Sequence, residues 1–263
     1  MQTAINESKK SSRTSDAARR RMLSVRGEPL FYADWRRAVF IHYEVEAAVL
    51  QRDVPFELDL DDGRAYVSLV AFTMCGMRPR LGGHLAEWLF KPIATHEFLN
   101  VRAYVRHEGE PGIYFLAEWL ANPLSIRLGP ATFGLPYRFA RIHYDHQHER
   151  GALNGLVTSP AHASRLEYHA EINRDASFGP CAADSRDEFL MERYTAFTQN
   201  RSKRRFFRIW HPPWPQTAIN ADMTDISLLT GVWPWFAKAK YLGANYSPGV
   251  EKVWMGRPHR VGA

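Results

Sequence analysis

Two neighbouring apolar runs decide the fold: Glu97-Phe-Leu-Asn-Val-Arg-Ala-Tyr-Val105 and Ile113-Tyr-Phe-Leu-Ala-Glu-Trp-Leu120. Both are rich in β-branched and aromatic residues, which favour strands. The segment between them, His107-Glu-Gly-Glu-Pro-Gly112, has the glycines and the proline of a turn. The sequence therefore predicts two adjacent antiparallel strands joined as a hairpin.

Outward from this hairpin, the same composition predicts further strands and a few short helices. Strands are expected at residues 38–43, 64–72, 165–172, 204–210 and 250–255, with a second hairpin from 137–147 to 155–158. Helices are expected at 46–52, at 124–128, and after the capping pattern Ser185-Arg-Asp-Glu188, where Phe189, Arg193 and Phe197 recur every four residues. Residues 75–95 are expected to be irregular. This pattern indicates a mainly β or α+β fold wrapped around a core.

The charge lies almost entirely at one end of the chain. The formal charge of the 263 residues is +6, and residues 1–26 carry +5 of it, with seven basic residues and two acids. This Ser-rich segment has no aromatic residue, so we expect residues 1–25 to be a disordered basic leader and residues 26–263 to form one domain. A body with a net charge near +1 argues against nucleic acid as a partner.

The compartment follows from what the sequence lacks. Cys75 and Cys181 form no disulfide or zinc pattern, and no apolar run reaches the roughly 18 residues of a membrane span. The N-terminus has no secretory signal, and Glu7 and Asp16 argue against an organellar transit peptide. We therefore expect a cytoplasmic protein without a membrane partner.

Several segments resemble the YqjF-like family, an uncharacterised family that is similar in fold to acetoacetate decarboxylase. They occur in order over residues 30–256: His96-Glu-Phe-Leu-Asn-Val-Arg-Ala-Tyr-Val105, Pro111-Gly-Ile-Tyr-Phe-Leu116, Phe133-Gly-Leu-Pro-Tyr-Arg138, Trp210-His-Pro-Pro-Trp-Pro215 and Asn245-Tyr-Ser-Pro-Gly-Val250. The resemblance implies antiparallel sheets wrapped into an acetoacetate-decarboxylase-like barrel with a few short helices.

The segment from Phe133 to Arg138 resembles the decarboxylase sequence F-G-Y-P-K-K. In that enzyme the first lysine forms a Schiff base and the second lowers its pKa. The resemblance places Tyr137 at the nucleophile position and Arg138 at the helper position, and Glu97 matches an active-site glutamate. The decarboxylase's first-strand arginine corresponds here to Glu44. A phenol cannot form an imine, so we expect no Schiff-base decarboxylation.

Other candidates follow from their own chemistry. Glu118 interrupts an apolar strand, so it is either a pocket acid with a pKa raised by burial or an outward-facing residue. Tyr137 could donate a hydrogen bond to a carbonyl or enolate oxygen, or could be a core tyrosine. Arg138 could lower the pKa of a nearby acid or form a structural salt bridge. Arg102 and His211 are candidates for substrate binding, although His211 could equally cap a strand. Strand alternation puts Glu97 and Arg102 on opposite faces unless a bulge intervenes.

Two further patterns are assigned structural roles. In His143-Tyr-Asp-His-Gln-His148 the first histidine points away from the other two on a strand, so no metal site is expected, and no cofactor either. The basic and aromatic run Arg201-Ser-Lys-Arg-Arg-Phe-Phe-Arg208 could bind RNA, but it also has the alternation of a half-buried strand, which we favour.

The leading hypothesis is a small-molecule pocket in which Tyr137, Arg138, Glu97 and Glu118 perform acid/base chemistry on a carbonyl or carboxylate compound. The first three residues should converge in one concave pocket. The alternative is a non-catalytic ligand-binding or structural protein. The expected partner is a small-molecule ligand, and a homo-oligomer is left open.

Overall fold

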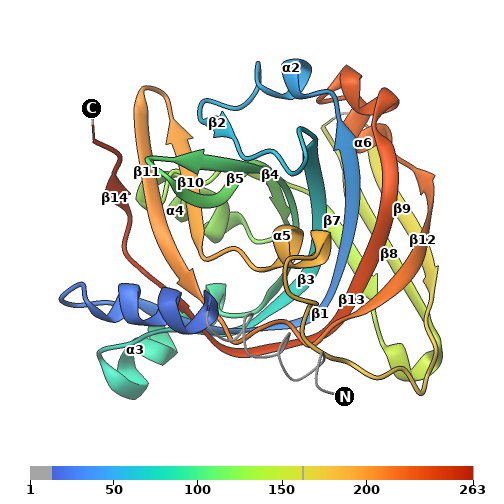
Figure 1. Ribbon diagram of the computed structural model, residues 1–263. Helices are drawn as coiled ribbons and strands as arrows, with labels where there is room; N and C mark the ends of the chain where they lie inside the picture. Colours follow the sequence, from blue (N-terminus) through green and yellow to red (C-terminus); the bar gives the residue numbers. More distant parts are fainter. Residues whose placement is uncertain (1–13, 162, 263) are drawn as a thin grey trace, which may run out of the picture.

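The computed structural model describes residues 14–161 and 163–262. They form one large, mostly antiparallel sheet with a few short helices (Figure 1). The strands are β1 (Phe31–Val45), β2 (Glu57–Leu58), β3 (Ala65–Pro79), β4 (His96–His107), β5 (Glu110–Leu120), β6 (Tyr137–Phe139), β7 (Arg141–Asp145), β8 (Ala152–Ser159), β9 (Ser164–Glu171), β10 (Thr195–Asn200), β11 (Lys203–Trp210), β12 (Thr217–Asp225), β13 (Lys240–Met255) and β14 (His259–Arg260). The helices of four or more residues after residue 30 are α2 (Ala47–Leu50), α3 (Gly83–Phe90), α4 (Pro123–Thr132), α5 (Arg186–Met191) and α6 (Ser227–Thr230), with a 3-10 helix at Pro234–Lys238.

The sheet closes on itself. Its strand order is β14-β11-β10-β5-β4-β3-β1-β13-β12-β9-β8-β7, and β11 also pairs with β13. That additional pairing joins Ile209 to Met255 and Trp210 to Trp254. The strands from β11 to β13 therefore form a ring, with α5 drawn inside it (Figure 1). The predicted mainly β barrel is confirmed.

The two faces of the ring build two different cores. On β4, Leu99, Val101 and Ala103 contribute to an outer core shared with residues of β8 and β9. The residues of β4 that alternate with these three point inward. Among them, Phe98 and Tyr104 join an inner core that includes Leu190 of α5. Successive strand residues face opposite sides, so this division follows directly from the pleat.

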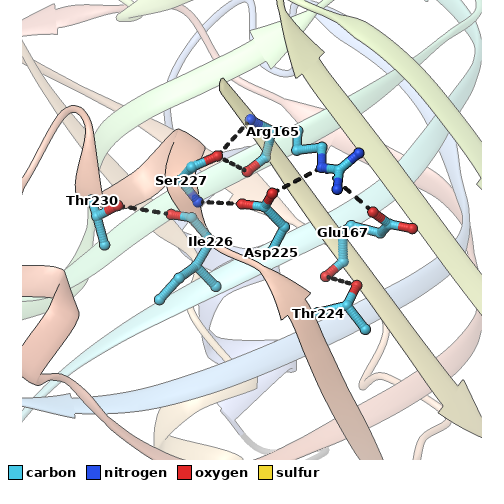
Figure 2. Close-up of polar contacts among 7 residues, drawn as sticks. All are labelled: Arg165, Glu167, Thr224, Asp225, Ile226, Ser227 and Thr230. Carbon is cyan, nitrogen blue, oxygen red and sulfur yellow. Dashed lines mark hydrogen bonds and ion pairs between the residues drawn. The ribbon is translucent and has the colours of Figure 1, made fainter. Parts of the chain in front are cut away.

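The second layer, β7, β8, β9 and β12, is fastened to α6 by a polar cluster (Figure 2). The Arg165 Nε donates to Asp225 Oδ2 at 2.8 Å, and the Ser227 backbone N donates to Asp225 Oδ1 at 2.7 Å. The Ser227 hydroxyl also accepts a bond from the Arg165 backbone N at 3.0 Å. The bond to Asp225 satisfies the first backbone N–H of α6, whose N-cap residue Ile226 makes no side-chain cap bond.

The local predictions differ in accuracy. The hairpin of β4 and β5 is confirmed, whereas residues 75–95 are not irregular, because they contain the end of β3, α3 and a 3-10 helix. The capping box is confirmed, since the Ser185 hydroxyl accepts from the Glu188 backbone N at 3.1 Å. Its helix ends at Met191 instead of continuing to Phe197, because residues 195–200 pair with β5 and β11. The period of four was therefore a coincidence across a helix end and a strand.

The second predicted hairpin is only partly correct. Its arms are β7 and β8, paired in antiparallel register from Arg141 to Asp145. The three residues of β6 belong elsewhere, because they pair in parallel with β5. β10 and β12 were not predicted.

The N-terminal leader requires a correction. Residues 1–13 lie outside the described residues, but residues 14–23 are helical. Ser15 and Met22 are buried, and the Ser15 hydroxyl donates to the His211 carbonyl at 2.8 Å. The Arg19 guanidinium lies 5.4 Å from the Trp210 ring centroid. One apolar side chain, a buried hydroxyl and a cation–π contact thus dock a segment that composition alone marks as disordered. No helix among the described residues could cross a membrane.

The docked helix predicts an effect on stability. Met22 has no exposed surface, whereas its neighbour Leu23 is 51% exposed. Met22→Ala should lower the free energy of unfolding by about 2 kcal/mol or more, because a buried methionine is removed. Leu23→Ala should change it by less than about 0.5 kcal/mol. Urea unfolding of the two variants measures both values, and equal effects would show that the helix does not dock.

Candidate functional site inside the barrel

The ring encloses a cavity of about 330 Å³, called the barrel cavity below. Its walls are mostly apolar, with Phe72, Phe98, Phe115 and Phe133 among the lining residues. Nine polar residues of the described chain also line the cavity: His96, Asn100, Arg102, Glu118, Ser125, Thr132, Tyr137, Arg193 and His211. An apolar cavity with few convergent polar groups is the usual form of a small-molecule site.

Glu118 is buried in this wall without a partner. The side chain is 4% exposed, and within the described part of the chain its Oε2 has no hydrogen-bond partner. Burial raises the pKa of the Glu118 carboxyl well above its usual range. Burial therefore favours the protonated form of this carboxyl, which can donate a proton or a hydrogen bond.

A β-bulge aims Glu118 into the barrel. Val101 of β4 pairs with Ala117, but Arg102 pairs with Phe115, so Leu116 is an extra residue in β5. Phe115 faces the barrel cavity, and without the bulge Glu118 would face the outer core. With it, Glu118 shares the inner face with its cross-strand partner Asn100, whose Oδ1 also has no partner among the described residues.

Tyr137 lies next to Glu118. β6 runs parallel to β5 with Tyr137 opposite Glu118. Gly134 has a φ of 75° in the preceding turn, a conformation that glycine adopts readily. A Cβ on Gly129 of α4 would lie 2.2 Å from the Tyr137 ring, so this glycine leaves the space that the ring occupies. Burial, followed by the Glu118 carboxyl, raises the pKa of Tyr137, so its hydroxyl remains a donor.

Two further polar groups in the wall were not identified from sequence. His96 carries two buried ring nitrogens with no partner among the described residues, and burial lowers its pKa to about 4. Trp35 also has a buried Nε1 without a partner there. His96 could have been found, since it shares the strand parity of Arg102. Nothing in the sequence distinguished Trp35 from a core tryptophan.

Arg102 and His211, which the sequence suggested for substrate binding, both line the barrel cavity. The Arg102 Nη2 donates to the Leu190 carbonyl at 2.7 Å. His211 is buried beside Trp35 and Trp214, and burial lowers its pKa to about 4. The imidazole is therefore neutral near pH 7.

Glu97 and Arg138 do not join Tyr137, so the expected convergence is wrong. Alternation puts Glu97 on the outer face of β4. Burial there raises the pKa of its carboxyl, whereas His143 and a hydrogen bond from the Tyr144 backbone lower it. Arg138 follows Tyr137 and faces outward, with its guanidinium 5.6 Å from the Trp119 ring centroid. A catalytic role for either residue stays a prediction, but at a different place from the barrel cavity.

The histidine cluster and the basic run have structural contacts. The His146 ring bonds to the Tyr168 hydroxyl at 2.7 Å and to the Arg37 carbonyl at 2.9 Å. In β11 the side chains of Phe207 and Ile209 are buried while Lys203 and Arg204 are exposed. This burial pattern is that of a half-buried strand.

The raised pKa of Glu118 predicts a pH-dependent stability. The folded protein keeps a proton that the unfolded chain releases at a lower pH, so wild-type stability should fall as pH rises from the unfolded pKa toward the folded one. Glu118→Gln cannot titrate and should escape this loss. Its melting temperature relative to wild type should therefore rise between about pH 5 and about pH 8. Glu171→Gln, at an exposed position, is the control. A constant difference would show that Glu118 is ionised in the folded protein.

Comparison with known proteins places the chain among uncharacterised ones. A family model named DUF2071, described as an uncharacterized conserved protein, matches residues 32–251. The uncharacterized protein YqjF of Bacillus subtilis is 28% identical over 196 residues, which cover 72% of this chain and 76% of that protein.

Solved structures share the fold at low identity. An acetoacetate decarboxylase-like enzyme from Sphingomonas wittichii RW1 aligns over 89% of this chain and 94% of its own, with a TM-score of 0.62 and 17% identity. Acetoacetate decarboxylase from Legionella pneumophila aligns over 89% and 87%, with a TM-score of 0.58 and 12% identity. The enduracididine biosynthesis enzyme MppR, complexed with pyruvate, aligns over 90% and 92%, with a TM-score of 0.59 and 15% identity. These similarities show the acetoacetate-decarboxylase-like fold.

Proposed function

We propose that this chain, which belongs to the DUF2071 family, binds a small carbonyl or carboxylate compound in the barrel cavity and performs acid/base chemistry on it without a covalent intermediate. The observation that carries the proposal is the buried carboxyl of Glu118, whose Oε2 has no partner among the described residues and which lies beside Tyr137. A folded protein rarely leaves such a group unsatisfied unless a ligand or water completes it.

The pair can act on a carbonyl group. A neutral carboxylic acid and a phenol both donate hydrogen bonds, and two donors aimed at one oxygen stabilise an enolate in a dry cavity. The neutral His96 imidazole supplies an acceptor on the same wall. Enolisation of a carbonyl compound needs a hydrogen-bond donor for the oxygen and a base for the α-proton. Glu118 and Tyr137 can fill the first role, and His96 the second.

Schiff-base chemistry does not fit the cavity. Among the described residues that line it, none is a lysine. Tyr137 stands where the decarboxylase resemblance puts the imine-forming lysine. The fold relatives include a decarboxylase and an enzyme bound to pyruvate, which supports carbonyl compounds as the ligand class while the chemistry differs.

The alternative is a non-catalytic ligand-binding protein. It is supported by the mostly apolar walls and by the low pKa of His96 and His211, which leaves both uncharged. Such walls can hold a ligand without reacting with it. Turnover distinguishes the two functions.

Proton exchange tests the catalytic proposal. Wild-type protein in deuterated buffer should speed exchange of the α-protons of a ketone such as 4-phenyl-2-butanone, measured by NMR. Glu118→Gln should lose at least about 100-fold of this rate, a typical contribution of general acid catalysis. Tyr137→Phe should weaken ketone binding by about 0.5–1.5 kcal/mol. Saturable binding without exchange would favour the binding protein.

Trapping tests for the covalent alternative. Borohydride added with acetoacetate or pyruvate should leave the mass of the protein unchanged, because a phenol cannot form an imine. Intact-mass spectrometry gives the result, with a lysine-dependent decarboxylase as the positive control. A mass increase that maps to a lysine of this chain would contradict the proposed mechanism.

A further inference from the structure

Arg102 is a buried cation without a carboxylate partner. Its side chain is 7% exposed, and among the described residues no Asp or Glu oxygen lies within 4.0 Å of its guanidinium. The Nη2 bonds to the Leu190 carbonyl, whereas the Nε is buried with no acceptor in that part of the chain. Arg193, in the same wall, differs because its Nη1 lies 2.7 Å from Asp59 Oδ2.

Arg102 has no direct ion pair among the described residues, although burial raises the pKa of the nearby Glu192 carboxyl and the Arg102 charge lowers it. The guanidinium carbon lies 5.5 Å and 5.8 Å from the ring centroids of Phe40 and Tyr104, contacts that offset part of the desolvation cost. Burial raises the pKa of the Glu118 carboxyl and so disfavours a negative charge there. The Glu192 carboxylate is engaged by the Trp214 backbone N and the Tyr194 hydroxyl. An unpaired buried charge is costly, so the cavity favours an anionic occupant at this end.

The shape of the cavity limits the rest of that occupant. Among its lining residues, Leu128 and Thr132 of α4 are exposed, whereas Arg102 and His211 are buried. A ligand that enters beside α4 and reaches Arg102 passes phenylalanine walls. The volume equals that of about eleven waters, so a two- or three-carbon acid would leave most of these walls uncovered.

We propose that Arg102 binds the carboxylate of an apolar acid of aryl-alkyl size, whose body packs against the phenylalanine walls. This inference rests on the proposed function, because both use the barrel cavity. It adds that the ligand carries a carboxylate and that Arg102 binds it. A carboxylate oxygen accepts from the free Nε–H, and charge-assisted bonds of this kind are among the strongest in proteins. Glu118 and Tyr137 then face a different part of the ligand.

A matched pair of probes tests the inference. Calorimetry of the full chain with 4-phenylbutanoate and 4-phenylbutanamide compares a carboxylate with a neutral group of the same shape. Wild type should bind the carboxylate about tenfold more tightly or better. Arg102→Met should abolish this preference, because the carboxylate loses much more affinity than the amide does. Arg106→Met, on the same strand but paired with Asp59, should keep it.

Each outcome decides the matter. Equal affinity of wild type for the two probes, or an unchanged preference in Arg102→Met, overturns the role of Arg102. The proposed function would survive that result if Glu118→Gln still lost proton exchange on the neutral ketone. If Arg102→Met does not fold, the wild-type preference and a reduced preference in Arg102→Lys, which lacks the planar fork, give the answer. Failure of both probes to bind at millimolar concentration overturns the inference, whereas the proposed function is decided by proton exchange on the ketone.

Discussion

The alternation of side chains around a closed ring of strands is the constraint on which the site depends. Once β11 pairs with both β10 and β13, every strand of the ring has one face toward a common interior. The bulge at Leu116 is the exception that matters, because it turns Glu118 into that interior. Two polar side chains on these strands can therefore meet in the cavity only if both lie on the inner face of their strands.

The closed interior also decides the charge of each group in it. Burial lowers the pKa of His42 to about 3, which leaves the imidazole neutral near pH 7, and it raises the pKa of Glu118, which favours the protonated carboxyl. His42, Ser68 and Tyr104 form a chain of hydrogen bonds that ends at the Leu190 carbonyl, which Arg102 also contacts. This chain holds Tyr104 against the guanidinium. Packing and these hydrogen bonds together thus fix the guanidinium of Arg102 in the wall of the barrel cavity.

One fold can support different chemistry when the side chains of its site differ. Gly134 and the space above Gly129 place the side chain at position 137 in the barrel cavity whatever its chemistry. In the proposed function, Tyr137 donates a hydrogen bond from this position, since a phenol cannot form an imine. The proposed acid/base role and the proposed Arg102 contact both use this frame without a covalent step.

The sequence by itself determined the hairpin of β4 and β5, the mainly β class and the candidacy of Glu118, because these depend on composition and on local pattern. The candidacy of Tyr137 came from the resemblance to the decarboxylase segment. Three other results needed the tertiary structure: the inward turn of Glu118, the positions of Glu97 and Arg138 away from Tyr137, and the docking of residues 14–23. The face of the sheet on which a side chain lies depends on the bulge at Leu116 and on closure of the ring, and both involve pairing between residues distant in sequence. Docking depends on one methionine and one serine meeting a surface made by other strands. No local period records such contacts, since their free energy comes from partners that only the folded chain brings together.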